Sequence, residues 1–375
     1  MEEPPGKTNP VASLTDDILV KILSFLPVRY VCRFKCVSRS WRNLISHPDY
    51  RKKLPQTLVG FFYESICGER FPMRANHFTN VTGKGMPFIF PSVSFLPVSC
   101  RDLVLLDCCD GLLLCRCFQP GPLVGGELPP FHYAVCNPAT EKWVMLPDGS
   151  WASDDARTAR LCFDRTGSSH FHVIEYVVDE NENVTWVDIY SSKTGSWIPV
   201  ENGWGDDVML CYRRRSVFLN GFLHAVTFAD AIVAVDMEGK TSRTIPTPKE
   251  NECGFIHRAQ DHLCLINVVD DDIFKLSIWT LDDHATIEWT LKHTVSTMRL
   301  FGGKRIQIDF DYQVIAMHPE GNMIFFVYGW ENTLMAYIMD RREVHVIRNL
   351  GHDSSYWDPY LPYVPLFSEA PIDGQ

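Results

Sequence analysis

The thirteen cysteines of this sequence are its most reactive side chains, and one group of them has the residue types of a zinc site. Cys108, Cys109, Cys115 and Cys117 lie close together, and His132 follows. Structural zinc sites are usually built from CxxC pairs, and this group has none. The N-terminal residues lack the apolar stretch of a secretion signal, so we expect the thiols to stay reduced. We interpret the cysteines as small buried hydrophobic residues and predict no metal and no cofactor.

No catalytic constellation is predicted. The sequence has no GxSxG elbow, HExxH pair, phosphate-binding loop or GxGxxG turn opening a helix. His224, His318 and His345 occur singly in or beside predicted strands, and we interpret them as structural residues. The run 270–272 is Asp-Asp-Asp, which could hold a cation, but the spacing of an EF-hand is missing and a solvated hairpin tip is expected.

One run of arginines is a candidate for binding a target. Arg213, Arg214 and Arg215 precede a predicted strand in an otherwise acidic part of the chain. Clustered guanidinium groups pair well with phosphate, so this run could receive a phosphorylated protein. The alternative is an ordinary solvated loop.

Charge is unevenly distributed along the sequence. Residues 14–54 hold nine Lys or Arg and three Asp, a net +6, which leaves −17 for the rest of a chain whose net charge is −11. A basic head favours an acidic partner. Nucleic acid is disfavoured because the acidic body would repel phosphate. No run of about 18 apolar residues is present, so no membrane span is predicted.

The basic head is predicted to form three short helices. Apolar residues at 18, 19, 22, 23 and 26 follow one face of a helix that Thr15 or Ser13 caps and Pro27 ends. A second helix is expected over about 28–36, and a third begins after Ser38 and ends before Pro48. So small a core rarely stands alone, and the unit is therefore interpreted as a docking module.

From residue 58 onward, short runs rich in β-branched and aromatic residues alternate with clusters of Gly, Pro, Asn and Asp. This pattern is typical of β-strands joined by turns, and no long amphipathic helix interrupts it. The predicted strands include 58–63, 87–95, 102–107, 111–118, 131–136, 171–178, 184–190, 231–236, 263–269, 275–281, 312–317, 322–329, 334–340 and 344–350.

A loose repeat runs through these strands. It is marked by Trp143, Trp197, Ile245, Trp289 and Val346, which are 54, 48, 44 and 57 residues apart. A period near 50 residues suits kelch-like blades, each a four-stranded sheet that must stack against others in a ring. The length of the region predicts about six blades. The three tryptophans are interpreted as packing between blades.

Residues 14–54 resemble an F-box. The positions that carry the resemblance are Leu14, Asp16, Ile18, Ile22, Leu23, Leu26, Pro27, Val28, Cys32, Val37, Ser38, Trp41 and Leu44. Thr15 stands where the family usually has proline, and a hydroxyl cap can start the helix equally well. The later chain resembles the F-box-associated, kelch-like region of plant F-box proteins. That resemblance rests on Cys109–Leu113, Val135–Thr140, Trp143, Leu146–Pro147, Gly221–His224 and Tyr363–Pro365.

The predicted fold is therefore α+β in separate domains. Residues 13–54 form a three-helix F-box, 55–368 form an all-β kelch-like propeller of six blades, and 1–12 and 369–375 are flexible tails. The F-box core is expected to contain Ile22, Leu23, Phe34, Trp41 and Leu44. The residues expected to bind a Skp1-type adaptor are Leu14, Ile18, Leu26, Pro27, Val28 and Val31, together with Arg29 and Arg33.

The resemblance implies a substrate-recognition subunit of a Skp1–cullin–F-box ubiquitin ligase, without catalytic activity of its own. The partners would be the adaptor, the cullin reached through it and a protein target, in the cytoplasm, the nucleus or both. Long loops at 119–130, 147–157, 201–213 and 351–360 are expected to present the target. Two alternatives remain: an F-box scaffold or transcriptional cofactor outside any ligase, and a ligand- or carbohydrate-binding propeller.

Overall fold

A computed structural model describes most of the chain. The residues that it describes are 14–24, 31, 34, 37–47, 50, 58–66, 74–84, 87, 89, 91, 93–97, 100, 103–118, 130–149, 158–165, 167–201, 204, 208–212, 214–248, 254–269, 272–283, 286–304, 311–351, 360–366 and 372. The chain divides into two compact units, residues 1–57 and 58–375. The finer domain boundaries given above stay predictions.

The N-terminal unit contains helices α1 (Asp16–Ser24) and α3 (Arg39–Ser46). Helix α1 starts where predicted, with Leu19 N donating to Thr15 O at 3.0 Å. The Ser38 side chain caps α3 by accepting a hydrogen bond from Trp41 N at 3.2 Å, which satisfies one of the free N–H groups of the first turn. The helix predicted between them falls largely outside the described residues.

The core of this unit differs from the prediction at two positions. Its buried residues are Val20, Leu23, Val31, Leu44 and Ile45, and Leu19, Phe34, Trp41 and Tyr50 pack against them. Val31, predicted to lie on the exposed ridge, is only 2 % exposed, and Ile22, predicted for the core, is 47 % exposed. The reason is helical phase: α1 turns positions 19, 20 and 23 inward, so position 22 points away from them.

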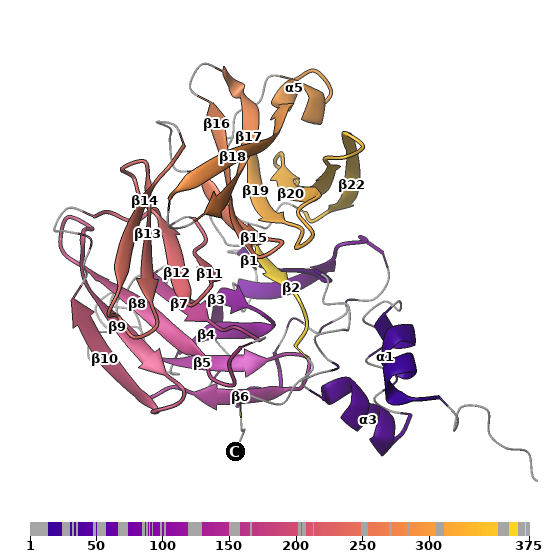
Figure 1. Cartoon of the computed structure of the whole chain (residues 1–375), viewed down its shortest axis with the longest axis vertical. Helices are drawn as coiled ribbons and strands as arrows, with labels where there is room; N and C mark the ends of the chain where they lie inside the picture. The colour runs from indigo at the N-terminus through magenta and orange to yellow at the C-terminus, as the bar shows by residue number, and fades with distance from the viewer. Residues whose placement is uncertain are drawn as a thin grey trace, which may run out of the picture. The chain divides into compact units, whose positions relative to one another are not determined.

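In the second unit, the described residues form six sheets. Five have four strands, and their strand orders are β3-β4-β5-β6, β10-β9-β8-β7, β11-β12-β13-β14, β15-β16-β17-β18 and β19-β20-β21-β22. The sixth has three, in the order β2-β1-β23. Neighbouring strands are antiparallel throughout. Figure 1 shows these sheets following one another around a ring, so the predicted six-bladed propeller is confirmed.

The strand bounds are as follows. The early strands are β1 (Gly60–Ile66), β2 (Arg74–Asn80), β3 (Leu103–Cys109), β4 (Leu112–Phe118), β5 (Phe131–Asn137), β6 (Lys142–Met145), β7 (Ala159–Cys162), β8 (His172–Val178), β9 (Val184–Ser191), β10 (Ser196–Glu201) and β11 (Val217–Leu219). The later strands are β12 (Phe222–Val226), β13 (Ala231–Asp236), β14 (Ser242–Pro246), β15 (Phe255–Ala259), β16 (His262–Val269), β17 (Asp272–Asp283), β18 (Glu288–Ser296), β19 (Tyr312–Met317), β20 (Met323–Tyr328), β21 (Thr333–Ile338), β22 (Glu343–Asn349) and β23 (Leu361–Tyr363). A short helix, α5 (Thr297–Leu300), follows β18.

The ring is closed by the two ends of the propeller sequence. Strand β23 pairs antiparallel with β1, with Gly60 opposite Tyr363 and Phe62 opposite Leu361. It also contacts β3 on one side and β19 on the other. The late strand therefore completes a blade whose other strands come from the start of the propeller, which removes an exposed sheet edge.

The repeat markers found in the sequence all lie on the fourth strand of a blade. Two of the tryptophans also join neighbouring blades: Trp197 Nε1 donates to Pro147 O at 2.8 Å, and Trp289 Nε1 donates to Pro246 O at 3.0 Å. Each acceptor lies at or just after the fourth strand of the preceding blade. This contact gives the period near 50 residues a physical cause.

One predicted strand is wrong. Among residues 87–95, those that the structure describes belong to no strand, and residues 94–96 lie in a turn. Pro87 and Pro91 interrupt the run, and proline cannot donate to a sheet ladder. Two of the strands missed in the sequence, β7 and β11, are too short to show a pattern, and a third, β2, has seven residues that are mostly polar.

The cysteines of the suspected zinc group serve the core instead. Cys108, Cys115 and Cys117 are buried in one hydrophobic cluster, while the ring of His132 lies 2.7 Å from Asp148. Within the described residues, no three His, Cys, Asp or Glu side chains gather as metal ligands would. Among the residues that the structure describes, no helix is long and apolar enough to cross a membrane.

Candidate functional site

The N-terminal unit carries an apolar stripe on the outside of α1. Ile18 and Ile22 lie four residues apart on one face of α1, and Leu14 comes two residues before the helix begins. The exposed fractions of Leu14, Ile18 and Ile22 are 37, 49 and 47 %. Leu26, Pro27, Val28, Arg29 and Arg33, predicted to bind the same adaptor, lie outside the described residues. Of the residues predicted to bind the adaptor, the structure therefore describes Leu14 and Ile18 as exposed and Val31 as buried. Ile22, predicted for the core, is exposed beside Ile18.

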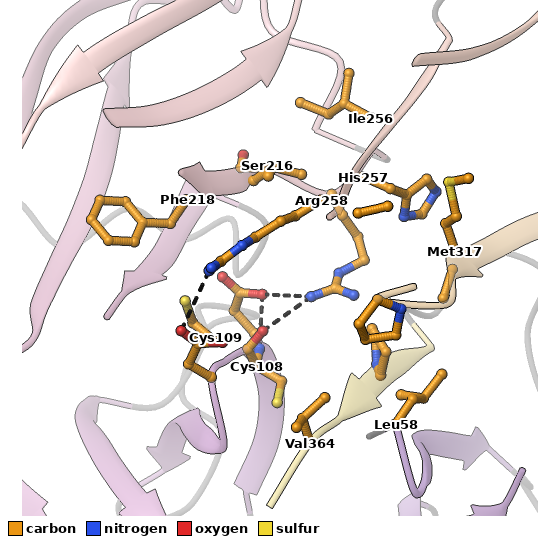
Figure 2. Close-up of a pocket in the computed structure, with 18 of the residues that line it drawn as sticks. Leu58, Cys108, Cys109, Ser216, Phe218, Ile256, His257, Arg258, Met317 and Val364 are labelled. Atoms are coloured by element: carbon orange, nitrogen blue, oxygen red, sulfur yellow. Dashed lines mark hydrogen bonds and ion pairs between the residues drawn. The ribbon is translucent and has the colours of Figure 1, made fainter. Parts of the chain in front are cut away.

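The propeller contains a central cavity of about 320 Å³. Its wall includes residues from the first strand of five blades and from β23, which takes the place of the first strand in the sixth. These residues are Asp107–Cys109 on β3, Leu161 on β7, Val217 and Phe218 on β11, Ile256–Ala259 on β15, Ala316 and Met317 on β19, and Pro362 on β23. Figure 2 shows Cys108 and Cys109 on one side of the cavity and His257 and Met317 on the other. The cavity lies toward the end of the ring where first strands turn into second strands, because Asp110, Gln260 and Pro319 also line it.

Asp107 ties three blades together at the wall of this cavity. Its Oδ1 accepts from Cys108 N at 2.8 Å and from Arg215 Nη2 at 3.4 Å, and its Oδ2 accepts from Leu161 N at 3.0 Å. Arg215 Nη2 also donates to Cys108 O at 3.1 Å. A buried carboxylate is stable only when it is paired and hydrogen-bonded, and Asp107 meets both conditions.

Asp110 gathers two further arginines from other blades. Its carboxylate lies 3.7 Å from Arg165 Nε and 3.5 Å from Arg258 Nη1. Arg258 Nη2 in turn lies 2.8 Å from Asp261, whose side chain is 78 % exposed. Arginines that follow β7, precede β11 and lie on β15 therefore converge on two aspartates of one blade.

The arginine run singled out in the sequence does not act as a unit. Arg213 lies outside the described residues. The Arg214 guanidinium is 3.8 Å from the centre of the Phe255 ring, whereas Arg215 turns into the cavity toward Asp107. A binding role for the run stays a prediction.

Sequence reasoning missed most residues of the cavity, including the charged or titratable Asp107, Arg165, His257 and Arg258. One signal was present, because Asp107 is the lone charged residue within the apolar strand 103–109, and such residues are rarely buried without a partner. Which arginines pair with Asp107 depends on the order of the blades around the ring, and no spacing in the sequence indicates that order.

The cavity groups are suited to binding rather than to covalent chemistry. Burial raises the pKa of the Cys108 thiol to about 12, so it is not a thiolate nucleophile. Burial, with a contribution from Arg215, lowers the pKa of His257 to about 3, so its ring is neutral. Both aspartates are engaged by arginines, which disfavours the pair of independent carboxylates that a hydrolytic propeller would need.

The turn after β3 holds the C-terminal segment in place. Asp110 and Gly111 have φ values of 45° and 92°, the conformation of a tight Asp-Gly hairpin turn. A Cβ on Gly111 would lie 2.5 Å from Leu366 Cβ and 2.7 Å from Val364 O. Asn137 Nδ2 donates to Leu366 O at 2.9 Å. The Asp110–Gly111 turn and Asn137 thus both contact the segment that follows β23.

We expect Gly111→Ala to lower the free energy of unfolding by about 2–4 kcal/mol, because it combines backbone strain with a clash against Leu366. Denaturant unfolding of the full chain measures the loss. Gly221→Ala is the matched control: it lies in the corresponding turn of another blade at φ +82° with no atom within 4 Å of the new Cβ, so it should cost only the strain of about 1–2 kcal/mol. Equal losses would show that the contact with Leu366 is unimportant.

Comparison with known proteins assigns both units. Residues 12–53 match the F-box domain, and residues 98–368 match the F-box associated beta propeller domain. Among similar proteins of Arabidopsis thaliana, "F-box protein At5g07610" is 24 % identical over 75 % of this chain and 70 % of its own length. "Putative F-box/kelch-repeat protein At1g15680" is 24 % identical over 96 % and 90 %, respectively.

These matches agree with the architecture built above from the strands and helices. The propeller match extends over more than half of the chain. It includes the turn after β3 and the segment after β23 that this turn contacts. The chain therefore belongs to the F-box proteins that carry an F-box associated β-propeller domain.

Proposed function

We propose that this protein is the substrate-recognition subunit of a Skp1–cullin–F-box ubiquitin ligase. Its F-box binds a Skp1-type adaptor, its propeller binds a protein target, and it performs no chemistry itself. The observation that carries the proposal is the exposed apolar stripe formed by Ile18 and Ile22 on an F-box helix and by Leu14 just before it. Such ligases act in the cytoplasm and the nucleus, and we place the protein in one or both.

The stripe fits an adaptor interface for an energetic reason. A small helical unit that keeps three large aliphatic residues on its surface loses the stability that burying them would provide, about 1.5–3 kcal/mol for each. A partner that covers them recovers that free energy. Buried apolar anchors of this kind usually contribute most of the affinity of an interface.

The end of the propeller opposite the cavity supports target binding. In each blade the turn from the second to the third strand, and the connection to the next blade, lie at this end. The four long loops predicted to present the target connect strand ends there, although most of their own residues lie outside the described ones. Two exposed aromatic residues lie in turns at the same end: Phe228 between β12 and β13 (59 % exposed) and Trp330 between β20 and β21 (84 %). Aromatic residues are enriched at protein interfaces.

We expect Ile18→Asp with Ile22→Asp to weaken adaptor binding by about a hundredfold or more, because two apolar anchors become charges facing a dry surface. Surface-based binding of the full chain to a purified Skp1-type adaptor measures the effect. The control is Ile198→Asp, an aliphatic residue of the propeller that is 53 % exposed, which should bind normally. An unchanged affinity of the double variant, with its circular dichroism intact, would refute this docking surface.

A further inference from the structure

The central cavity is large enough for a small molecule. Its volume of about 320 Å³ lies at the lower end of the range of about 300–1,000 Å³ that small-molecule sites occupy. All six blades contribute to its wall, so the site exists only in the closed ring. It also lies at the end of the ring opposite the loops expected to meet the target.

The wall carries three arginines and three aspartates. Arg165, Arg215 and Arg258 face the buried carboxylates of Asp107 and Asp110, which are only 7 and 14 % exposed. The third carboxylate, that of Asp261, is mostly in solvent but lies 2.8 Å from Arg258 Nη2 and so offsets the charge of that arginine. The distances from Asp107 and Asp110 to their arginines, 3.4–3.7 Å, are longer than those of a tight guanidinium–carboxylate pair. Arg215, whose ion pair with Asp107 is 3.4 Å long, is therefore the arginine that can best donate to a further anion.

Two buried polar atoms of this wall have no hydrogen-bond partner within the described part of the chain. They are Arg215 Nε and His257 Nε2. The His257 residue is more than nine-tenths buried, and both side chains line the cavity. An unsatisfied buried polar atom costs about 1–3 kcal/mol, so a ligand that satisfies these atoms gains that free energy on binding.

The rest of the wall is apolar. Phe218, Ile256 and Met317 come from three different first strands, and Leu58 and Val364 adjoin them. The site therefore combines a polar region that contains Arg215 and His257 with a hydrophobic one. A ligand that matches it needs an anionic group attached to an apolar body.

We propose that the central cavity binds a small organic anion, whose carboxylate or phosphate group contacts Arg215 and whose apolar part lies against Met317. The ligand would bridge residues of several blades and so stabilise the closed ring. The proposal does not depend on the ligase function, since it concerns the propeller alone.

Calorimetric titration of the full chain tests the proposal with four probes: phenylacetate, phenyl phosphate, inorganic phosphate and neutral benzyl alcohol. We expect at least one aromatic anion to bind about tenfold or more tightly than benzyl alcohol, because a charge-assisted hydrogen bond is lost in the alcohol. Phenylacetate against phenyl phosphate distinguishes a carboxylate from a phosphate ligand. Inorganic phosphate should bind more weakly than phenyl phosphate, because it leaves the apolar wall uncovered. Failure of both aromatic anions to bind in the millimolar range would overturn the proposal, as would equal binding of the alcohol.

Variants locate the site. Arg215→Met should weaken anion binding by about tenfold or more, and Met317→Trp should abolish it by filling the cavity. Arg243→Met is the control, because Arg243 stacks on Phe222 outside the cavity and its loss should leave binding unchanged. Should Arg215→Met fail to fold, Met317→Trp still decides the matter. Anion binding that persists in folded Met317→Trp would overturn the assignment.

Discussion

A chain that lacks residues 358–375 is expected to lose the cooperative unfolding of its propeller and to aggregate. The deletion removes β23, which forms the inner edge of the blade built on β1 and β2. Without it β1 presents unpaired N–H and C=O groups, and an exposed strand edge is a template for association with other chains.

The deleted segment also belongs to the cores of several blades. Leu361 and Tyr363 pack with Phe62 in one hydrophobic cluster, and Tyr363 lies 5.3 Å from the Phe62 ring centre. Leu366 and Ile372 belong to another cluster, so Ile372 is buried although it falls in the stretch predicted as a flexible tail. Each buried apolar side chain contributes about 1.5–3 kcal/mol, and the sum for these four is comparable to a domain's whole net stability of about 5–15 kcal/mol.

Thermal unfolding followed by circular dichroism, together with size-exclusion chromatography, measures the result. A chain that lacks only residues 373–375 is the control, because it keeps Ile372 and every described strand. It should melt as the full chain does. If the longer deletion melted at the same temperature as the full chain, ring closure by β23 would be energetically irrelevant and this account of the propeller would be wrong.

The second large effect is expected from a buried polar network between two blades. Arg116 on β4 is fully buried, and its Nη2 donates to the Tyr133 hydroxyl at 3.3 Å. That hydroxyl donates to Glu175 Oε1 on β8 at 2.8 Å, and Glu175 is 1 % exposed. Burial, aided by the Glu175 carboxylate, raises the pKa of Tyr133, so the hydroxyl keeps its proton and can donate.

We expect Glu175→Leu to lower the free energy of unfolding by about 3–5 kcal/mol, the usual cost of removing one charged partner from a buried network, because Glu175 and Arg116 share the Tyr133 hydroxyl. Arg116 cannot lose its proton to escape the penalty, because its guanidinium stays charged in proteins. Tyr133→Phe should cost less, about 1–3 kcal/mol, since it removes hydrogen bonds but no charge.

Urea unfolding of the full chain measures both variants. Glu201→Leu is the matched control, because Glu201 lies exposed on β10 of the same blade and its replacement should change stability by no more than about 0.5 kcal/mol. A loss for Glu175→Leu as small as that of the control would mean that the Arg116 charge is compensated by other groups.

Much of the fold could be predicted from the sequence because the signals are local. The cap at Ser38, the alternation of strand and turn, and the Asp110–Gly111 hairpin each depend on neighbouring residues and on backbone preferences. The spacing of the fourth-strand markers indicated the blade period because each blade repeats the same contact with the one before it. The short runs of β7 and β11 escaped notice because three or four residues cannot display a period.

What only the tertiary structure decided is which distant residues meet. The phase of α1 against its neighbours placed Ile22 outside, and packing against Val20, Leu23, Leu44 and Ile45 placed Val31 inside; no pattern within one helix states either outcome. Arg165, Arg215 and Arg258 reach two aspartates of one blade only because the ring brings the first strands of all six blades around one axis. The cavity is therefore a property of the closed ring. The sequence indicates each strand and turn along the chain, but which residues of different blades come into contact is decided by the packing of the blades.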